Sequence, residues 1–416
     1  MVDYGLFVQG IPDNPLKRLD NGHVIPDASV EELAESHERN VENLVEVGAK
    51  AEAFGYDYFV AAEHHSSLVS TLLPNPLQIQ TAVARETDEI RPLQMANILP
   101  WHEPVRLAEQ TATLDVVSEG RAEVGVGQGD TGLGGETLGQ YWGGTANDRL
   151  RNRKSFEEKL DILRRAWTED FLDYAGEFHR IPPSYAEWTS KQEYFYFADE
   201  ASEYDPDDYF LLDGDTTTLR SLPVLPKPKQ DPHPQLWKPG MSARSIEWAA
   251  RQGMNVCTHC ADFENVAKRV EAYHGAAAEA GWPDHRPEHD SESFDRGWDA
   301  RRGRGVVPVV SAFNTEVASD ETREKWRRGF EMGLSRREDD AEIDLDVDEF
   351  VVESDMPIVG DSAEIAARLR ELASRCDYAD FAVVLHAEAF GLDHGAHLEQ
   401  AEAFAERVVP RLEERP

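Results

Sequence analysis

The chain has 416 residues, which is long enough for two or three average domains or for one large α/β barrel with insertions. Its 80 acidic and 42 basic residues give a net charge of -38, and this excess argues against binding to nucleic acids or to anionic membranes. Hydrophobic residues still make up 40% of the sequence, so we expect a large core beneath an acidic surface adapted to a salt-rich cytoplasm, where screening weakens the repulsion between carboxylates.

Short apolar runs alternate with helical patterns along the chain, which is typical of the βα units of a parallel sheet. The eight expected strands span residues 4–8, 58–62, 92–99, 122–126, 235–237, 255–259, 306–313 and 381–385. The nine expected helices span residues 35–53, 77–85, 105–117, 153–167, 243–251, 263–279, 321–332, 363–374 and 398–412. Eight such units without a break predict an α/β protein with one (β/α)8 TIM barrel domain over residues 1–416.

Three segments depart from this alternation and are predicted to be insertions in loops. The first, at about 170–230, is rich in Tyr, Phe, Asp and Pro, and its aromatic residues favour an ordered, packed segment. The second lies at about 283–303. The third, at about 336–355, is acidic, and we expect much of it to be a solvated surface run.

The cysteines and the N-terminus bear on the compartment and on metal binding. Cys257, Cys260 and Cys376 are too few for a disulfide framework, and the first residues lack the basic and apolar regions of a signal peptide. No apolar run approaches the ~20 residues of a membrane helix, so we expect a cytoplasmic protein. Cys257 and Cys260 are spaced like half of a zinc site, but the chain has no second pair, so we expect no metal there and place Cys257 in the barrel core.

Glu63, His64 and His65 follow an apolar run, residues 56–62, that is typical of a buried strand. Strands of a parallel sheet are covered on both faces, so ionisable side chains belong at their carboxyl ends, where α/β enzymes place their chemistry. Strand alternation directs His64 to one face and Glu63 and His65 to the other. Histidine exchanges protons readily near neutral pH, which makes His64 the first catalytic candidate, unless it only lines the mouth and forms a hydrogen bond there.

Motifs in a fixed order extend over nearly the whole chain outside the insertions. They are GYDYFVAAEHH, LLPNPLQIQTAVARETDEIR, ILPWHEPVRLAEQTATLDVVSEGRAEVGVGQGD, RKSFEEKLDILRRAW, SARSIEWAARQG, IVGDSAEIAARLREL and AEAFAERVVPRLEE. Together they resemble the bacterial-luciferase-like flavin-dependent oxidoreductases. The resemblance implies a barrel that binds a flavin at the carboxyl ends of its strands, commonly in a homodimer.

The resemblance also implies roles for residues at the ends of the second and third strands. His64 would lie near the reactive edge of the isoalloxazine and assist proton transfer, with Glu63 and His65 as supporting members of the catalytic group. Met95 and Ala96 would pack against the flavin ring and be joined by a non-prolyl cis peptide, which these residue types do not by themselves require.

A phosphate site is predicted at the start of the helix at 243–251. Gly240 and the N-cap residue Ser242 precede this helix, so free backbone N–H groups and hydroxyls face an incoming anion, although Ser242 alone would also suit an ordinary helix cap. The resemblance assigns phosphate contacts to Ser242 and Ser245, and we include the adjacent Met241 among the cofactor-binding residues. The resemblance adds Arg153, because a guanidinium binds a phosphate through two parallel hydrogen bonds.

Gly125, Gly127 and Gly129 have the spacing of a dinucleotide fingerprint in part. No helix opens directly after them, as that fingerprint requires. We expect these glycines instead to let the fourth strand approach the flavin closely, with Gln128 near the phosphate or the ribityl chain. Luciferases carry a reactive cysteine where this chain has Gly127 and a glutamate where it has Met241, so we do not expect light emission.

The resemblance implies a monooxygenase that takes reduced FMN from a separate flavin reductase and uses O2 on a small organic substrate. A hydride-transfer oxidoreductase that uses the deazaflavin coenzyme F-420 is the first alternative, and the Glu-His-His form favours FMN. A metal-dependent hydrolase with His64, His65, His259 and His386 as ligands is the second, although the paired histidines usual after the first strand are missing. A flavin-binding protein without activity is a further alternative.

Overall fold

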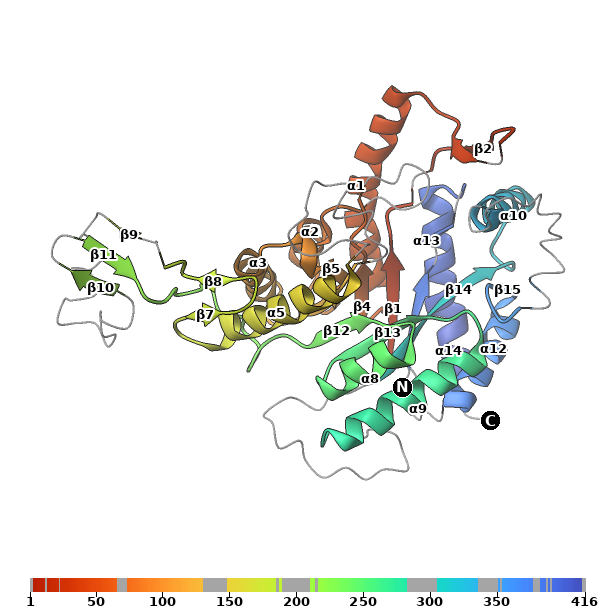
Figure 1. The fold of residues 1–416 in the computed structure, drawn as a ribbon. Helices are drawn as coiled ribbons and strands as arrows, with labels where there is room; N and C mark the ends of the chain where they lie inside the picture. The colour runs from red at the N-terminus through yellow and green to blue at the C-terminus, as the bar shows by residue number, and fades with distance from the viewer. Residues whose placement is uncertain are drawn as a thin grey trace. The chain divides into compact units, whose positions relative to one another are not determined.

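Eight parallel strands form the closed barrel that the sequence predicts (Figure 1). In the computed structural model they are β1 (Asp3–Val8), β4 (Tyr58–Ala61), β5 (Arg91–Ile98), β6 (Glu123–Gly127), β12 (Leu236–Pro239), β13 (Asn255–His259), β14 (Val306–Asn314) and β16 (Ala382–His386). Hydrogen-bonded neighbours follow the order β13-β12-β6-β5-β4-β1-β16-β14, and a further pairing of β13 with β14 closes the ring. The expected strand positions are confirmed because strands buried on both faces carry continuous apolar runs.

The described part of the chain divides into two compact units. The structure describes residues 3–11, 13–21, 23–65, 73–129, 148–184, 187–188, 210–213, 216–282, 305–335, 351, 354–376, 382–386, 388–389 and 391–413. The first unit, residues 1–97, 121–127 and 235–416, contains the barrel apart from the last residue of β5, and the second comprises residues 98–120 and 128–234. None of the helices in the ranges above is long and apolar enough to cross a membrane. That residues 1–416 form one domain stays a prediction.

The helices of the first unit also lie where the sequence predicts them. They are α1 (Val30–Ala53), α2 (Pro76–Glu86), α8 (Ala243–Arg251), α9 (Phe263–Glu279), α10 (Asp320–Ser335), α12 (Ser362–Cys376) and α13 (His394–Ala403). The last of these continues through a π-helical turn, η2 (Phe404–Val408), into α14 (Val409–Glu413). Helix α1 begins earlier than expected because Ser29 and Glu32 form a capping box, with hydrogen bonds of 3.2 and 2.7 Å.

Smaller elements complete the two units. The first unit also contains the hairpin of β2 (Leu16–Arg18) and β3 (Val24–Pro26) and the strand β15 (Ile358–Gly360), which pairs with β14. The second contains η1 (Leu99–Trp101), α3 (Pro104–Val117), α5 (Arg149–Thr168), β7 (Tyr174–Ala175), β8 (Arg180–Ile181), β9 (Glu187–Trp188), β10 (Phe210–Asp213) and β11 (Thr216–Leu219).

The first predicted insertion contains ordered structure. Its strands form two small antiparallel sheets, β7 with β8 and β10-β11-β9. The aromatic residues at 185 and 194–197, the insertion at 283–303 and most of the insertion at 336–355 lie outside the described residues.

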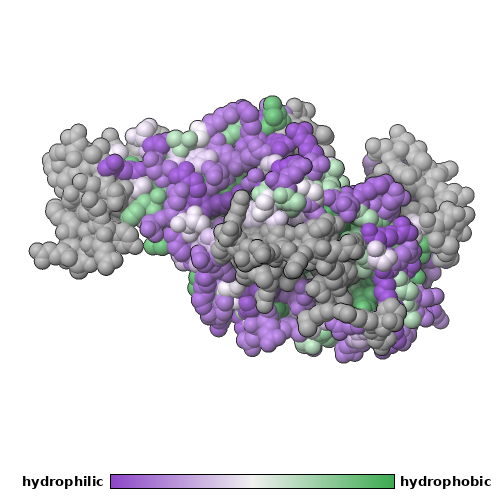
Figure 2. Space-filling view, turned by 90° about the horizontal axis from the view of Figure 1, so that it is seen from below, coloured by the Kyte–Doolittle hydropathy of each residue, from purple (hydrophilic) through white to green (hydrophobic). Residues whose placement is uncertain are grey.

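The barrel interior is filled by one cluster of buried side chains. Its members are Phe7, Tyr58, Val60, Ala62, Leu93, Met95, Ala96, Trp237, Cys257, Val307, Val309 and Val384. The prediction that Cys257 belongs to the core is therefore confirmed. At the amino end of the barrel the buried Glu123 carboxylate accepts a hydrogen bond from the Trp237 indole and pairs with Arg91 at 2.6 Å. Outside the core, hydrophilic residues predominate among the described residues on the face shown in Figure 2.

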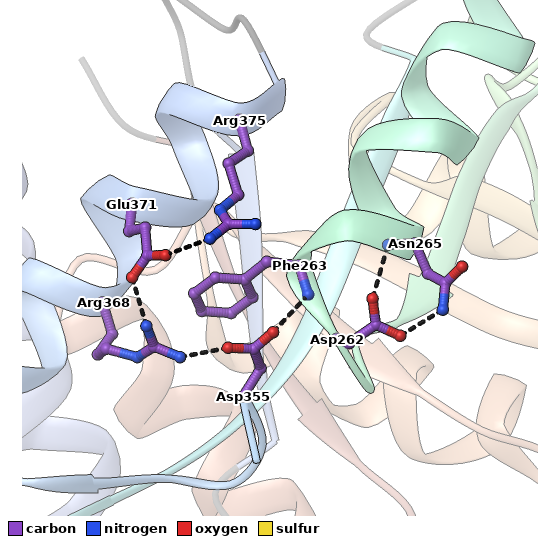
Figure 3. Close-up of polar contacts among 7 residues, drawn as sticks. All are labelled: Asp262, Phe263, Asn265, Asp355, Arg368, Glu371 and Arg375. Carbon is purple, nitrogen blue, oxygen red and sulfur yellow. Dashed lines mark hydrogen bonds and ion pairs between the residues drawn. The ribbon is translucent and has the colours of Figure 1, made fainter. Parts of the chain in front are cut away.

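Asp355, which precedes β15, joins the start of α9 to α12 (Figure 3). Its carboxylate accepts a hydrogen bond of 2.9 Å from the backbone N–H of Phe263 and forms an ion pair with Arg368. The Arg368 guanidinium lies 4.5 Å from the centre of the Phe263 ring. Glu371 pairs with Arg368 and, at 2.7 Å, with Arg375. These contacts hold the loop after β13, at the mouth of the barrel, against α12.

Candidate functional site

The carboxyl end of β4 carries the three ionisable residues that the sequence singled out. The backbone N–H of His64 donates a hydrogen bond of 3.0 Å to the carbonyl of Leu73, so the chain beyond the strand is held in place. Glu63 is buried, and its Oε1 lies 3.1 Å from Nε2 of His65. Glu63 and His65 thus lie on one side of the chain, in agreement with strand alternation, and they contact each other. Their supporting role and the catalytic role of His64 stay predictions.

His386, at the end of β16, lies in the same mouth as His64. Burial lowers the pKa of His386 to about 3, and the charges of His259, His397 and His64 oppose its protonation further. Its Nε2 lies 3.3 Å from the side-chain nitrogen of Gln9, which follows β1. At neutral pH His386 is therefore an uncharged imidazole that forms hydrogen bonds without taking up a proton. From the sequence it was considered only as a metal ligand.

Glu388 is a buried carboxyl at the mouth that the sequence analysis missed. Its oxygens accept hydrogen bonds from the backbone N–H groups of Gln9, Gly10 (3.2 Å) and Ile11 (3.3 Å), in a turn that Gly10 permits with a φ of 74°. Burial raises the pKa of Glu388 to about 7 in spite of these hydrogen bonds. The available signal was its spacing of two residues from His386, which in an extended chain places both on one side.

The end of β5 has the backbone that the resemblance implied. The Met95-Ala96 peptide bond is cis, and both side chains are buried in the barrel interior. The neighbouring strand gives a separate reason for Gly125. A Cβ atom on Gly125 would lie 1.9 Å from the carbonyl oxygen of Gln94, so β5 alone requires a glycine at this position. That the glycines of β6 let the strand approach the flavin stays a prediction.

The start of α8 presents hydrogen-bond donors suited to an anion. Ser242 caps the helix, its Oγ accepting a 3.3 Å hydrogen bond from the N–H of Ser245, and the first turn contains no acidic residue. Arg244 is exposed in this turn, and no described residue forms an ion pair or hydrogen bond with its guanidinium. Met241 is exposed beside them. A Cβ atom on Gly240 would lie 2.9 Å from Val256, which keeps this position small. The donor set fits a phosphate group.

Arg153 and Gln128 belong to the second compact unit. There the Arg153 guanidinium pairs with Glu157 at 2.8 Å, and the backbone carbonyl of Gln128 accepts a 3.2 Å hydrogen bond from Asn152. Their assignment to the cofactor stays a prediction.

The cysteines carry no sign of metal chemistry in the part of the chain that the structure describes. Burial raises the pKa of Cys257, Cys260 and Cys376 to about 12, which favours the neutral thiol. Among the described residues no three His, Cys, Asp or Glu side chains form a group that could hold a metal ion. The metal-dependent hydrolase therefore has no ligand set in these ranges.

Comparison with known sequences identifies relatives over much of the chain. The family model for luciferase-like monooxygenases matches residues 22–194 and 207–378. An uncharacterised protein of Sinorhizobium fredii, y4wF, is 26% identical over 216 residues, 52% of this chain and 49% of that protein. The oxygenase component of a flavin-dependent trigonelline monooxygenase from Acinetobacter baylyi is 23% identical over 253 residues, 59% of this chain and 56% of that protein. The chain thus spans about half the length of these relatives.

Solved structures share the fold along the whole chain. The monooxygenase RslO1 from Streptomyces bottropensis has a TM-score of 0.68 at 20% identity and covers 98% of this chain and 99% of its own. The oxygenating constituent of 3,6-diketocamphane monooxygenase from Pseudomonas putida, in complex with FMN, scores 0.65 at 18% identity, with 99% of both chains covered. An F-420-dependent secondary alcohol dehydrogenase scores 0.59 at 13% identity, again with 99% of both chains covered. These likenesses show a common barrel.

Proposed function

This chain belongs to the luciferase-like monooxygenase family, and we propose that it is a flavin-dependent monooxygenase that uses reduced FMN and O2 to oxygenate a small organic substrate. The start of α8 carries the proposal. Ser242, Ser245 and Arg244 form a donor set without an acidic neighbour in the first turn, in a chain with 80 acidic and 42 basic residues. Such a site suits the phosphate of a flavin mononucleotide.

Residues at the mouth of the barrel would bind the flavin ring, limit the access of water and transfer a proton. When bound, the reduced flavin would supply the electrons that activate O2. Met95 and Ala96 would contact its ring, and the surrounding apolar side chains would limit the access of water. A ring nitrogen of His64 would accept or release a proton at the edge of the flavin. The buried Glu63 and its partner His65 would fix the course of the chain around His64.

Hydride transfer with the deazaflavin coenzyme F-420 is the alternative. It is supported by the likeness in fold to the F-420-dependent alcohol dehydrogenase, and the same donor set would suit the phosphate of that coenzyme. The Glu-His-His motif resembles the luciferase side of the family, which favours FMN.

We further propose a separate flavin reductase as partner, a homodimer, and a cytoplasmic, salt-rich setting. The reductase is supported by the names of two similar proteins, one an oxygenase component and one an oxygenating constituent. The salt-rich setting is supported by the net charge of -38. The homodimer rests on the family resemblance.

Cofactor titration tests the proposed function. The purified protein is titrated with FMN, riboflavin and coenzyme F-420, and its O2 consumption is then measured with FMN, NADH and an added flavin reductase. We expect FMN to bind more tightly than riboflavin and the protein to increase O2 consumption with a suitable organic substrate. Binding of coenzyme F-420 alone would instead support hydride transfer, and tightly bound zinc without flavin affinity would refute both.

A further inference from the structure

A chain of buried amide side chains crosses the outer side of the barrel wall next to the candidate site. Its members are Gln80 on α2 and Gln94 and Asn97 on β5, and all three are at most 1% exposed. Amide side chains are rarely buried so completely unless their hydrogen-bonding groups are paired. The partners of these three therefore indicate what the chain holds together.

Gln80 binds the backbones of two neighbouring strands. Its side-chain nitrogen donates hydrogen bonds to the carbonyl of Phe59 in β4, at 3.1 Å, and to the carbonyl of Leu93 in β5, at 2.8 Å. Its oxygen accepts a hydrogen bond of 2.5 Å from the side-chain nitrogen of Gln94. A residue of α2 thereby fixes β4 relative to β5 from outside the barrel.

Asn97 extends the chain to a third strand. Its side-chain nitrogen donates to the side-chain oxygen of Gln94, at 3.2 Å, and to the backbone carbonyl of Gly125 in β6, at 3.1 Å. The three amides thus point in one direction, from Asn97 through Gln94 to Gln80, and each restrains the next. β4, β5 and β6 are linked by side chains in addition to their ladder.

Gln94 and Asn97 lie on either side of Met95 and Ala96 in the sequence. The amides bond outside the barrel, to α2 and to strand carbonyls, whereas the side chains of Met95 and Ala96 belong to the interior cluster. The amide chain therefore holds both ends of the two residues that face the proposed flavin ring.

We propose that Gln80, Gln94 and Asn97 are positioning residues that set the place of Met95 and Ala96 for contact with the flavin ring. The inference rests on the proposed function, because it requires that a flavin ring binds next to Met95 and Ala96. It differs from a general packing role, because loss of a buried amide elsewhere in the barrel is then expected to leave Met95 and Ala96 in place. Gln235 provides that comparison: it is also buried, and its nitrogen donates to the carbonyls of Leu236 and Gly253 near the amino end of β12.

The test compares Gln94→Met with Gln235→Met, because methionine keeps the length of glutamine and removes its amide. We expect Gln94→Met to weaken the binding of both FMN and riboflavin about tenfold, since the ring is common to the two. We also expect faster hydrogen exchange at the backbone amides of Met95, Ala96 and Asn97. Gln235→Met should lower the thermal midpoint to a similar extent while binding both flavins as the wild type does.

Unchanged flavin affinity together with unchanged exchange in Gln94→Met would overturn the inference, as would an equal loss of affinity in Gln235→Met. If Gln94→Met does not fold, Gln80→Met makes the same comparison from α2, outside the barrel strands. If the wild type binds no flavin, the proposed function fails, and the exchange measurement alone decides whether the amides hold the end of β5.

Discussion

Replacing Glu388 with glutamine tests whether a buried carboxyl at the barrel mouth titrates near neutral pH. Burial raises its pKa from 4.5 to about 7, so the folded protein holds this proton more tightly than the unfolded chain does. The contribution of this carboxyl to the stability of the protein is complete below its pKa in the unfolded chain. It is lost as the pH rises through its pKa in the folded protein. A pKa change from 4.5 to about 7 corresponds to roughly 3 kcal/mol, since one pH unit is worth ~1.4 kcal/mol.

Glu388→Gln cannot ionise, so its unfolding free energy relative to the wild type should rise by roughly 3 kcal/mol between about pH 4 and about pH 8. Urea unfolding at a series of pH values measures this difference. Burial also lowers the pKa values of His386 and His397. Their contribution to the stability of the folded protein is therefore lost as the pH falls below the pKa of histidine in the unfolded chain. Because His386 lies 4.0 Å from Glu388, the difference between wild type and variant also contains the coupling between these two groups.

Glu52→Gln is the matched control, because its difference in unfolding free energy from the wild type should change with pH in the opposite direction. Glu52 also accepts hydrogen bonds from three successive backbone N–H groups, at residues 88–90, but near the surface. Burial opposes its ionisation, yet these hydrogen bonds and Arg121 outweigh burial and lower its pKa. Its stabilising effect is thus present above the unfolded pKa and lost in acid, so the relative stability of Glu52→Gln should fall as the pH rises. A pH-independent or falling difference for Glu388→Gln would refute the reasoning.

Three further variants test the site and its scaffold. His64→Ala should retain flavin binding while O2-dependent turnover falls by ~10²-fold or more, the usual scale for a proton-transfer group, and unchanged turnover would remove its assigned role. Arg244→Ala should weaken FMN binding about tenfold in a fluorescence titration and leave riboflavin binding unchanged, because riboflavin lacks the phosphate; equal losses for both would contradict a phosphate contact. Glu123→Gln should lower the free energy of unfolding by roughly 3 kcal/mol in urea without affecting flavin affinity, because it removes the negative charge that pairs with the largely buried Arg91 at 2.6 Å; a loss below ~1 kcal/mol would show that the pair is dispensable.

The barrel was predictable because its strands carry a local signal. Residues 255–259 and 263–279 were expected as a strand and a helix and are observed with these bounds, since each depends on its own run of apolar residues or helical period. The earlier start of α1 was missed because it depends on the Ser29 capping box. The short strands of the first insertion were missed because two to four residues carry no periodic pattern.

The candidate site was predictable only where its motif is local. Glu63, His64 and His65 adjoin one another in the sequence, whereas Glu388 is bound by backbone groups almost four hundred residues away. No pattern of residue types reveals that such a pairing will bury a carboxyl. The same holds for Gly125. A side chain at this position would clash with a carbonyl of β5, and only the three-dimensional structure shows that contact.

The surroundings of the two carboxyls at the mouth assign them different chemistry. Glu63 has a histidine 3.1 Å away, while Glu388 lies 4.0 Å from the His386 ring and is bound by backbone N–H groups instead. His386, whose pKa is lowered to about 3 by desolvation, is uncharged at neutral pH and contributes hydrogen bonds there. Groups whose environments separate their pKa values take separate roles in proton transfer. Glu388, whose pKa burial raises to about 7, is thus suited to exchange a proton near neutral pH, whereas His386 is not.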